Sequence, residues 1–223
     1  MSEPQASREG TQRHWDEVHS SKDPDEVSWY QPEPGLSLEL IERAELPANA
    51  PILDLGGGTS SLAAHLLEGG HRDVTVADIS SAALERARRE LGPRAAGRVQ
   101  WLQVDVRSDR LQRRYALWHD RAVFHFMVDA ADRDGYLDNL RSGLRAGGHL
   151  VLATFGPEGP MSCSGLPVRR YGVEELQRLL GPEFRVLSSQ VEDHPTPGGD
   201  VQQFLYAHFQ RLDSSAVEGA PAL

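Results

Sequence analysis

Short apolar runs alternate with longer amphipathic segments through most of the chain. The apolar runs have the length of buried strands, and they cover residues 51–55, 73–77, 99–104, 115–119 and 148–154. The amphipathic segments have the apolar spacing of helices, and they cover residues 60–69, 80–91, 132–146 and 173–180. This alternation predicts repeated strand–helix–strand units, whose strands pair in parallel.

The pattern changes on either side of this region. Residues 184–192 and 203–210 alternate apolar and polar positions, which is typical of an antiparallel pair. The segment between them is rich in turn formers. Before the first strand, a helix is expected from Ser37 to about Ala44, with Ser37 as its N-cap.

Three regions differ in composition. Residues 1–35 form an aromatic-bearing N-terminal arm, and its polar start is expected to be disordered. Residues 36–213 have the length and apolar content of one domain with a full core. Residues 214–223 lack apolar periodicity and are expected to form a disordered tail.

The most informative motif is Ile52-Leu-Asp-Leu-Gly-Gly-Gly-Thr-Ser60, in which a buried strand carrying an acid runs into a triple-glycine turn. Glycine suits such a turn because it permits positive φ and leaves no Cβ beside a ligand. Asp78 and Asp105 follow the next two strands, and Asp78 is placed to hold a ribose diol. Ligands bind beyond the carboxyl ends of strands in open α/β sheets, so these acids are expected to share one site.

These features resemble class I S-adenosylmethionine (SAM) dependent methyltransferases, whose first motif is acid-x-Gly-x-Gly. The resemblance runs over roughly residues 50–155, and Ser60 stands where the fuller pattern has a third glycine. It implies an α/β fold with a Rossmann-like seven-stranded sheet, mostly parallel with an antiparallel last strand, and helices on both faces. It also implies SAM as the cofactor.

By the family's pattern, Asp54 and the glycines face the methionine moiety, Asp78 holds the ribose hydroxyls and Asp105 the adenine amino group. The full cofactor-binding set that the resemblance implies is Asp54, Gly56, Gly57, Gly58, Thr59, Asp78, Ile79, Asp105, Val106 and His119. Among these, His119 is expected to contact the cofactor through its backbone rather than through its ring.

Candidate catalytic groups follow the fourth strand. A thiolate needs only alignment for methyl transfer, whereas an alcohol or a protonated amine also needs a base. Asp120 is a candidate base, with an ion pair to Arg121 as the structural alternative. His125 is a second candidate base, and its place between two phenylalanines equally fits a buried histidine with no catalytic role.

The arm and a long loop supply candidate substrate contacts. The aromatic residues of the arm either pack against the sheet edge or form a lid over the site, as in many small-molecule methyltransferases. After the fifth strand, residues 155–171 form a loop rich in proline and glycine, suited to an anionic or soft substrate. The expected substrate and lid set is Trp15, Trp29, Tyr30, Arg121, Cys163 and Arg170. For Cys163, a role as a small buried filler is the alternative.

The composition narrows the partners. A net charge of −10 argues against nucleic acid, which is bound through clustered cations. The single cysteine excludes an intrachain disulfide, and the histidines show no metal-ligand spacing, so no metal is expected. No apolar run reaches the roughly 18 residues of a membrane span, and the start lacks a signal-peptide layout. We therefore expect the protein to be cytoplasmic and to bind a small-molecule substrate. We expect it to be a monomer or a homodimer.

The leading prediction is a SAM-dependent methyltransferase that acts on a small molecule by in-line displacement. Residues 117–123 resemble the corresponding stretch of thiopurine methyltransferase-like enzymes, which favours a thiol or another soft nucleophile. Some protein-lysine N-methyltransferases have a similar Trp-Asp pair and arm, so that class is an alternative. An NAD(P)-binding Rossmann protein is an alternative of a different class, because the glycines and Asp78 partly fit its fingerprint. Asp54 and Asp105 argue against it.

Overall fold

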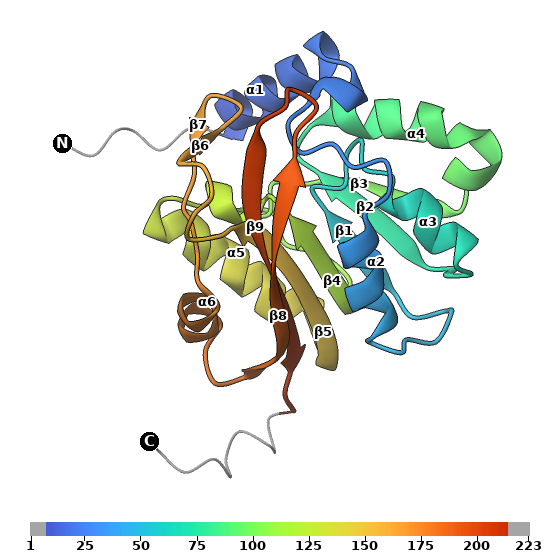
Figure 1. The fold of residues 1–223 in the computed structure, drawn as a ribbon. Coiled ribbons are helices and arrows are strands. Elements are labelled where there is room, and N and C mark those ends of the chain that lie inside the picture. The colour runs from blue at the N-terminus through green and yellow to red at the C-terminus, as the bar shows by residue number, and fades with distance from the viewer. Residues whose placement is uncertain (1–7, 214–223) are drawn as a thin grey trace.

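The computed structural model describes residues 8–213; residues 1–7 and the predicted tail of residues 214–223 lie outside the described residues. A seven-stranded sheet crosses the molecule (Figure 1), in the order β3-β2-β1-β4-β5-β9-β8. Its strands are β1 Ile52–Leu55, β2 Val74–Asp78, β3 Val99–Gln103, β4 Tyr115–Arg121, β5 Leu144–Phe155, β8 Phe184–Pro195 and β9 Val201–Arg211. The first five are parallel, β9 is antiparallel to β5, and β8 is antiparallel to β9. The predicted fold class is confirmed.

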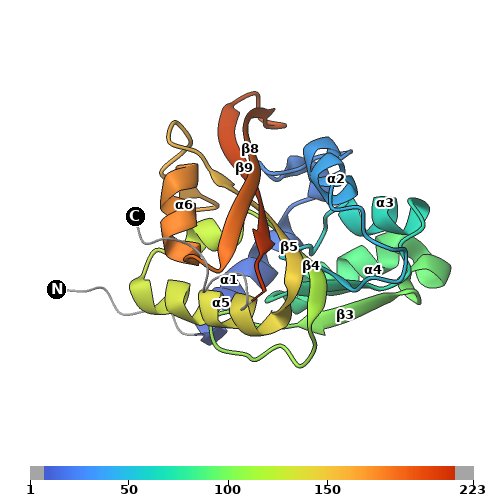
Figure 2. The same cartoon turned by 90° about the horizontal axis from the view of Figure 1, so that it is seen from below.

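Helices cover both faces of this sheet. They are α1 Arg8–Ser21, α2 Gly35–Glu42, α3 Leu62–Glu68, α4 Ser81–Ala96, α5 Ala130–Gly143 and α6 Val173–Leu180, with short 3-10 turns η1 Pro24–Glu26 and η2 Phe124–Phe126. A small hairpin joins β6 Ser162–Cys163 to β7 Leu166–Pro167. Figure 2 shows α2, α3 and α4 on one side of the sheet and α5 and α6 on the other. Of the helices within residues 8–213, none is long and apolar enough to cross a membrane.

The alternation of side chains along β1 divides the core into two layers. Ile52 packs in the cluster that contains the apolar residues of α2 and α3, whereas Leu53 and Leu55 pack with those of α5 and α6. All four residues of β1 are buried. A strand that is covered on both faces reads as a continuous apolar run, and this is why the parallel strands could be located from the sequence.

The largest difference from the sequence prediction is α1, which was not predicted as a helix and which begins at Arg8, within the polar start that was expected to be disordered. None of its residues is buried, so it lacks the strong apolar stripe that marks a core helix. Figure 1 shows α1 beside α4, at one end of the sheet. A second difference concerns Ser37. The helix begins two residues earlier, at Gly35, and Ser37 is a buried residue of its first turn rather than the N-cap.

Asp120 organises the turn that follows β4. Its side chain is fully buried, and its Oδ2 accepts a hydrogen bond of 2.6 Å from the Tyr136 hydroxyl of α5. Its two carboxylate oxygens also accept bonds from the backbone N–H groups of Val123 and Phe124. Burial raises the pKa of Asp120 to about 6, although these hydrogen bonds act in the opposite direction. The carboxylate therefore fixes η2 onto the sheet.

We expect Tyr136→Phe to lower the free energy of unfolding by about 1–3 kcal/mol, because the buried Asp120 carboxylate loses its hydroxyl donor. The indole N–H of Trp118, which donates to the same hydroxyl at 3.2 Å, also loses its partner. Urea denaturation measures the change. Tyr171→Phe is the matched control, because the buried Tyr171 hydroxyl has no hydrogen-bond partner among the described residues. Equal stability of the two variants would contradict the role given to Asp120.

Candidate active site

The glycine turn after β1 comes so close to its neighbours that no side chain fits there. Gly56 has φ +69°, and a Cβ on it would stand 2.1 Å from Cγ2 of Val123. A Cβ on Gly57 would stand 2.3 Å from Asp54 Oδ2. The turn is therefore a backbone surface with a carboxylate directly behind it, as a close approach to a ligand requires.

Asp78 connects the glycine turn to the end of β2. Its Oδ2 accepts from the Gly58 N–H at 3.1 Å, and its Oδ1 accepts from the Ser80 N–H at 2.9 Å. Burial raises the pKa of Asp78 to about 6; the backbone hydrogen bonds lower it, and the charge of Asp54 adds to the rise. The carboxylate of Asp78 therefore takes up a proton at higher pH than an exposed aspartate does.

A buried chain of three side chains joins α2 to the ends of β1 and β4. The two ring nitrogens of His119 lie 2.8 Å from Asp54 Oδ1 and 2.9 Å from the Ser37 hydroxyl. With Nδ1 protonated, the ring donates to Asp54 and accepts from Ser37. The ring of His119 is therefore engaged by protein groups at both nitrogens, and its backbone contact with the cofactor stays a prediction. Asp54 Oδ2 is buried and has no hydrogen-bond partner within residues 8–213.

Asp105 is paired with a cation that the sequence motifs did not reveal. Its oxygens accept from Nε and Nη2 of Arg107 at 2.9 and 2.7 Å. Burial alone would raise the pKa of Asp105, but the hydrogen bonds and charge of Arg107 hold the pKa below its ordinary value. Arg107 also donates to the Thr11 hydroxyl of α1 at 3.1 Å. The end of β3 is thereby tied to the N-terminal helix.

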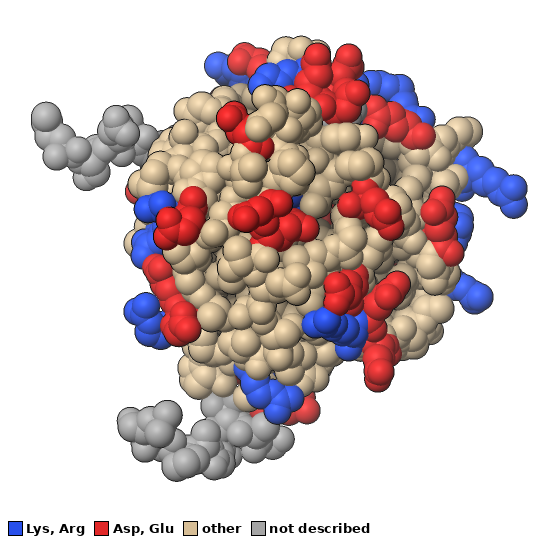
Figure 3. Space-filling model, viewed as in Figure 1, with Lys and Arg blue, Asp and Glu red and all other residues tan. Residues whose placement is uncertain are grey.

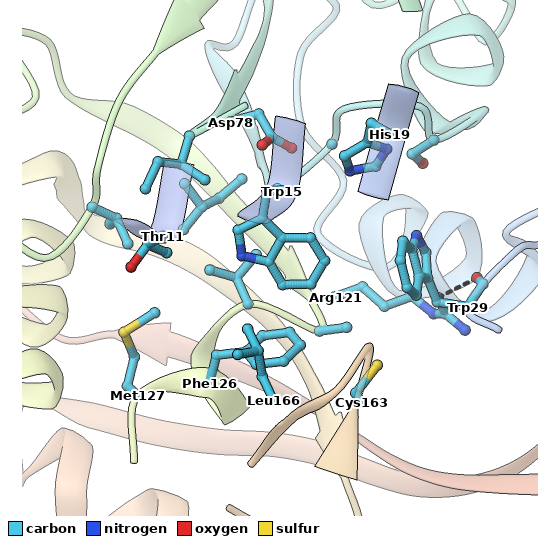
Figure 4. A pocket seen from close by; sticks show the side chains of 18 of the residues that line it. Thr11, Trp15, His19, Trp29, Asp78, Arg121, Phe126, Met127, Cys163 and Leu166 are labelled. Atoms are coloured by element: carbon cyan, nitrogen blue, oxygen red, sulfur yellow. Dashed lines mark hydrogen bonds between the residues drawn. The ribbon is translucent and has the colours of Figure 1, made fainter. Parts of the chain in front are cut away.

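These groups line one cavity of about 320 Å³ at the ends of the parallel strands (Figure 4). Its wall contains most of the expected site residues, namely Trp15, Trp29, Tyr30, Asp54, Gly56, Gly57, Thr59, Asp78, Ile79, Asp105, Val106, His119, Arg121 and Cys163. It also contains residues that no motif indicated, among them Thr11, His19, Ser37, Arg107, Phe126, Met127 and Leu166. Residues from distant parts of the chain thus meet around one space.

Four expected site residues do not line this cavity: Gly58, Asp120, His125 and Arg170. Asp120 points toward α5 and bonds to Tyr136, so it is neither an exposed base nor the ion-pair partner of Arg121. His125 is fully buried, accepts from the Phe155 N–H at 3.3 Å, and has its pKa lowered to about 3 by burial and by the charge of Arg121. Direct contact with a ligand in the cavity is not open to either side chain.

Helix α1 forms the roof of the cavity and is fastened by polar contacts. Asp16 Oδ1 accepts from the Ser80 hydroxyl at 2.7 Å and from the Ala82 N–H at 3.1 Å, at the N-terminus of α4. Farther along α4, Arg86 donates to the backbone carbonyls of His19 and Lys22. These contacts span more than 60 residues of sequence, and no local pattern distinguishes Asp16 or Arg86 from other surface charges.

The roof carries an aromatic cluster into the cavity. The Trp15 ring lies 5.0 Å from the ring of Phe126 and 5.9 Å from that of Trp29, both with edge-on geometry. His19 lies against the same two tryptophans, and burial and the charge of Arg86 lower its pKa to about 4. Figure 4 shows the Trp15 ring in the middle of the lining side chains. The cavity is therefore acidic along β1 to β3 and aromatic under α1.

Comparisons with known proteins agree with this architecture. Residues 53–150 match the family model of a methyltransferase domain. No curated protein matches the chain at a significant level. Among solved structures, the 1,6-didemethyltoxoflavin-N1-methyltransferase of Burkholderia thailandensis, crystallised with 1,6-didemethyltoxoflavin and S-adenosylhomocysteine, superposes with a TM-score of 0.72. It is 23% identical, and the match covers 96% of this chain and 94% of that one.

Two further structures have the same fold. The N-methyltransferase NodS of Bradyrhizobium japonicum, in complex with S-adenosylhomocysteine, is 18% identical over 89% of this chain and 98% of its own, with a TM-score of 0.67. A protein studied for the conversion of a disulfide bond into a thioacetal group during echinomycin biosynthesis is 19% identical over 93% and 96%, with a TM-score of 0.72. Residues 53–150 thus match a methyltransferase domain, and the chain has the fold of these methyltransferase structures. The closer resemblance to thiopurine methyltransferases stays a prediction.

We expect Asp16→Ala to loosen α1, because the N-terminus of α4 loses an anion and Ser80 loses its acceptor. The free energy of unfolding should fall by only about 1 kcal/mol, while hydrogen exchange of the backbone amides of residues 8–21 should rise clearly. Hydrogen–deuterium exchange read by mass spectrometry measures the effect. Glu17→Ala, an exposed acid of the same helix, is the control. Identical exchange in both variants would show that Asp16 does not hold the roof.

Proposed function

We propose that the protein transfers the sulfonium methyl group of SAM to a small-molecule nucleophile by in-line displacement. The observation that carries the proposal is the convergence of Asp54, Asp78 and Asp105 on one cavity, beside a turn too tight for any Cβ. Asp54 is the next-to-last residue of β1, Asp78 ends β2, and Asp105 follows β3. Open α/β sheets bind their ligands at these carboxyl ends of the strands.

The residues of the cavity suit the cofactor. The unpartnered Oδ2 of Asp54 is a buried acceptor, and the ammonium group of the methionine moiety would satisfy it. Asp78 would accept from the ribose hydroxyls, with Thr59 and Ile79 beside them, and Asp105 and Val106 would border the adenine. SAM would supply an electrophilic methyl group, while the protein aligns the acceptor and excludes water.

A small acceptor fits the way the cavity is covered. α1 lies over it with Trp15, and the hairpin of β6 and β7 contributes Cys163 and Leu166 to its wall. Aromatic rings beside a sulfonium also stabilise its charge. On the face shown in Figure 3, acidic side chains lie in several separate groups and basic ones lie mainly near the margins. Such a face does not favour phosphate backbones.

The absence of both predicted bases from the cavity wall favours a soft nucleophile, such as a thiol, over one that needs either of them as a base. Asp120 and His125 do not reach the cavity. His19 does, but with a pKa of about 4 it is a weak base at neutral pH. A nucleophile that presents its own lone pair needs alignment only.

The test supplies SAM with an isotopic methyl label to the protein together with lysate from its own source. Label in the small-molecule fraction supports the proposal, and label on protein would favour a protein-lysine N-methyltransferase. We expect Gly57→Ala to abolish transfer and binding of S-adenosylhomocysteine, since its Cβ would displace the Asp54 carboxylate. Gly198→Ala is the control, because only a side-chain atom 3.7 Å away would meet its Cβ. Binding of NADH instead of S-adenosylhomocysteine would overturn the proposal.

The affinity for S-adenosylhomocysteine should depend on the charge of Asp78. A ribose diol donates to a carboxylate, and because the pKa of Asp78 is raised to about 6, protonation competes with binding just below neutral pH. Affinity should be constant above about pH 7 and fall by up to about tenfold per pH unit below pH 6. Calorimetric titrations between pH 5 and pH 8 measure this.

Asp78→Asn separates this effect from the titration of Asp120, whose pKa is also about 6. The variant should bind more weakly and lose the pH dependence. A wild-type affinity that stays unchanged down to pH 5 would show that Asp78 does not hold the ribose.

A further inference from the structure

Arg121 is a cation in the cavity without a carboxylate partner. Two arginines line the cavity, and the first, Arg107, pairs with Asp105 and Asp132. Arg121 forms no ion pair with any residue of the described range 8–213. A partly buried guanidinium that lacks an anion has lost hydration without replacing it, so it favours an anionic ligand.

The guanidinium is nevertheless held in a defined orientation. Its Nε donates to the Tyr206 hydroxyl at 2.8 Å, and its Nη1 donates to the Trp29 carbonyl at 2.8 Å. Its central carbon lies 4.4 Å from the centre of the Phe204 ring. Glu192 interacts with the same Tyr206 hydroxyl, so this acid reaches Arg121 only indirectly.

One donor of this oriented group is left over. Nη2 of Arg121 is buried and has no hydrogen-bond partner in the described part of the chain. The neighbouring thiol of Cys163 does not serve as an anion, because burial raises its pKa despite the charge of Arg121. Figure 4 shows Arg121 extending toward Trp29 and away from Thr11, with Cys163 nearby. Arg121 therefore lies at the Trp29 end of the cavity, away from Thr11.

We infer that Arg121 is the anion-binding group of the cavity and that its Nη2 takes a carboxylate-type oxygen of a bound ligand. Trp15, Trp29 and Phe126 would flank the apolar body of that ligand. The inference rests on the proposed function, because two ligands of the reaction could bring such an oxygen: the methyl acceptor and the methionine carboxylate of SAM. The residues that hold Arg121 favour the acceptor, because Phe204 and Tyr206 belong to β9 whereas the proposed cofactor acids belong to β1, β2 and the end of β3. The test separates the two.

The first arm measures the preference for an anionic acceptor. Calorimetry with saturating S-adenosylhomocysteine compares 2-naphthoate with 2-naphthamide and indole-3-carboxylate with indole-3-carboxamide. The wild type should bind the acid at least about tenfold more tightly than the amide in one pair or both. Arg121→Gln should abolish that preference, and Arg121→Lys should retain part of it. Arg185→Gln, which removes an exposed arginine of β8, should leave it unchanged.

The second arm tests the cofactor as the source of the anion. S-adenosylhomocysteine carries the carboxylate, and 5′-methylthioadenosine lacks it. If Arg121→Gln weakens the former by about tenfold or more and spares the latter, Arg121 binds the cofactor's carboxylate. If the variant affects neither the acid preference nor S-adenosylhomocysteine, the inference is wrong.

Two controls keep this result interpretable. Melting temperatures show whether Arg121→Gln folds; if it does not, Arg121→Lys takes its place in both arms. The inference is overturned if the wild type binds each acid no more tightly than its amide and if the wild type and Arg121→Gln bind S-adenosylhomocysteine equally. That result leaves the proposed function intact. A wild type that fails to bind S-adenosylhomocysteine at all contradicts the proposed function itself.

Discussion

Close packing of the Gly56–Gly58 turn against its neighbours is the constraint on which the site depends. A Cβ on Gly58 would stand 2.7 Å from Asp78 Oδ2 and 2.9 Å from Ala83 Cβ. The turn can therefore pack against the end of β2 and the start of α4 only because Gly58 has no side chain. The Gly58 N–H then fixes the carboxylate of Asp78. Because these groups stand at the ends of strands buried on both faces, the sheet sets their positions.

The contact between the glycine turn and Asp78 also helps to position helix α1 over the cavity. Asp78 accepts from the Ser80 N–H, and the Ser80 hydroxyl donates to Asp16 of α1. A continuous series of hydrogen bonds thus runs from the glycine turn to the helix that carries Trp15. A helix with no buried residue gains little from the hydrophobic effect, so these polar contacts and the aromatic cluster account for its position.

The fold could be predicted from the sequence further than the site could. Buried strands and the amphipathic helix at 173–180 carry local signals, and that helix has the predicted bounds. By contrast, no local sequence signal shows which way the side chain of Asp120 points. Side chains alternate along β4, so Trp118 and Asp120 face α5 whereas His119 and Arg121 face the cavity. The sequence specifies the alternation, but which set faces the cavity depends on how α1 and α2 pack.

Two charged side chains of the cavity wall have buried atoms without hydrogen-bond partners among the described residues, and these atoms indicate which ligand groups the cavity binds. Asp54 Oδ2 and Arg121 Nη2 are both buried without partners in the described chain, and they are opposite in charge. Each costs folding free energy, because a buried charged atom without a partner has lost its hydration. A core would avoid that cost by pairing them with each other or by replacing both with apolar groups. Here each is instead fixed by other bonds, Asp54 through His119 and Arg121 through Tyr206 and Trp29. Such an arrangement is stabilised when ligands supply a cation at one point and an anion at the other, and it selects against ligands that lack either charge.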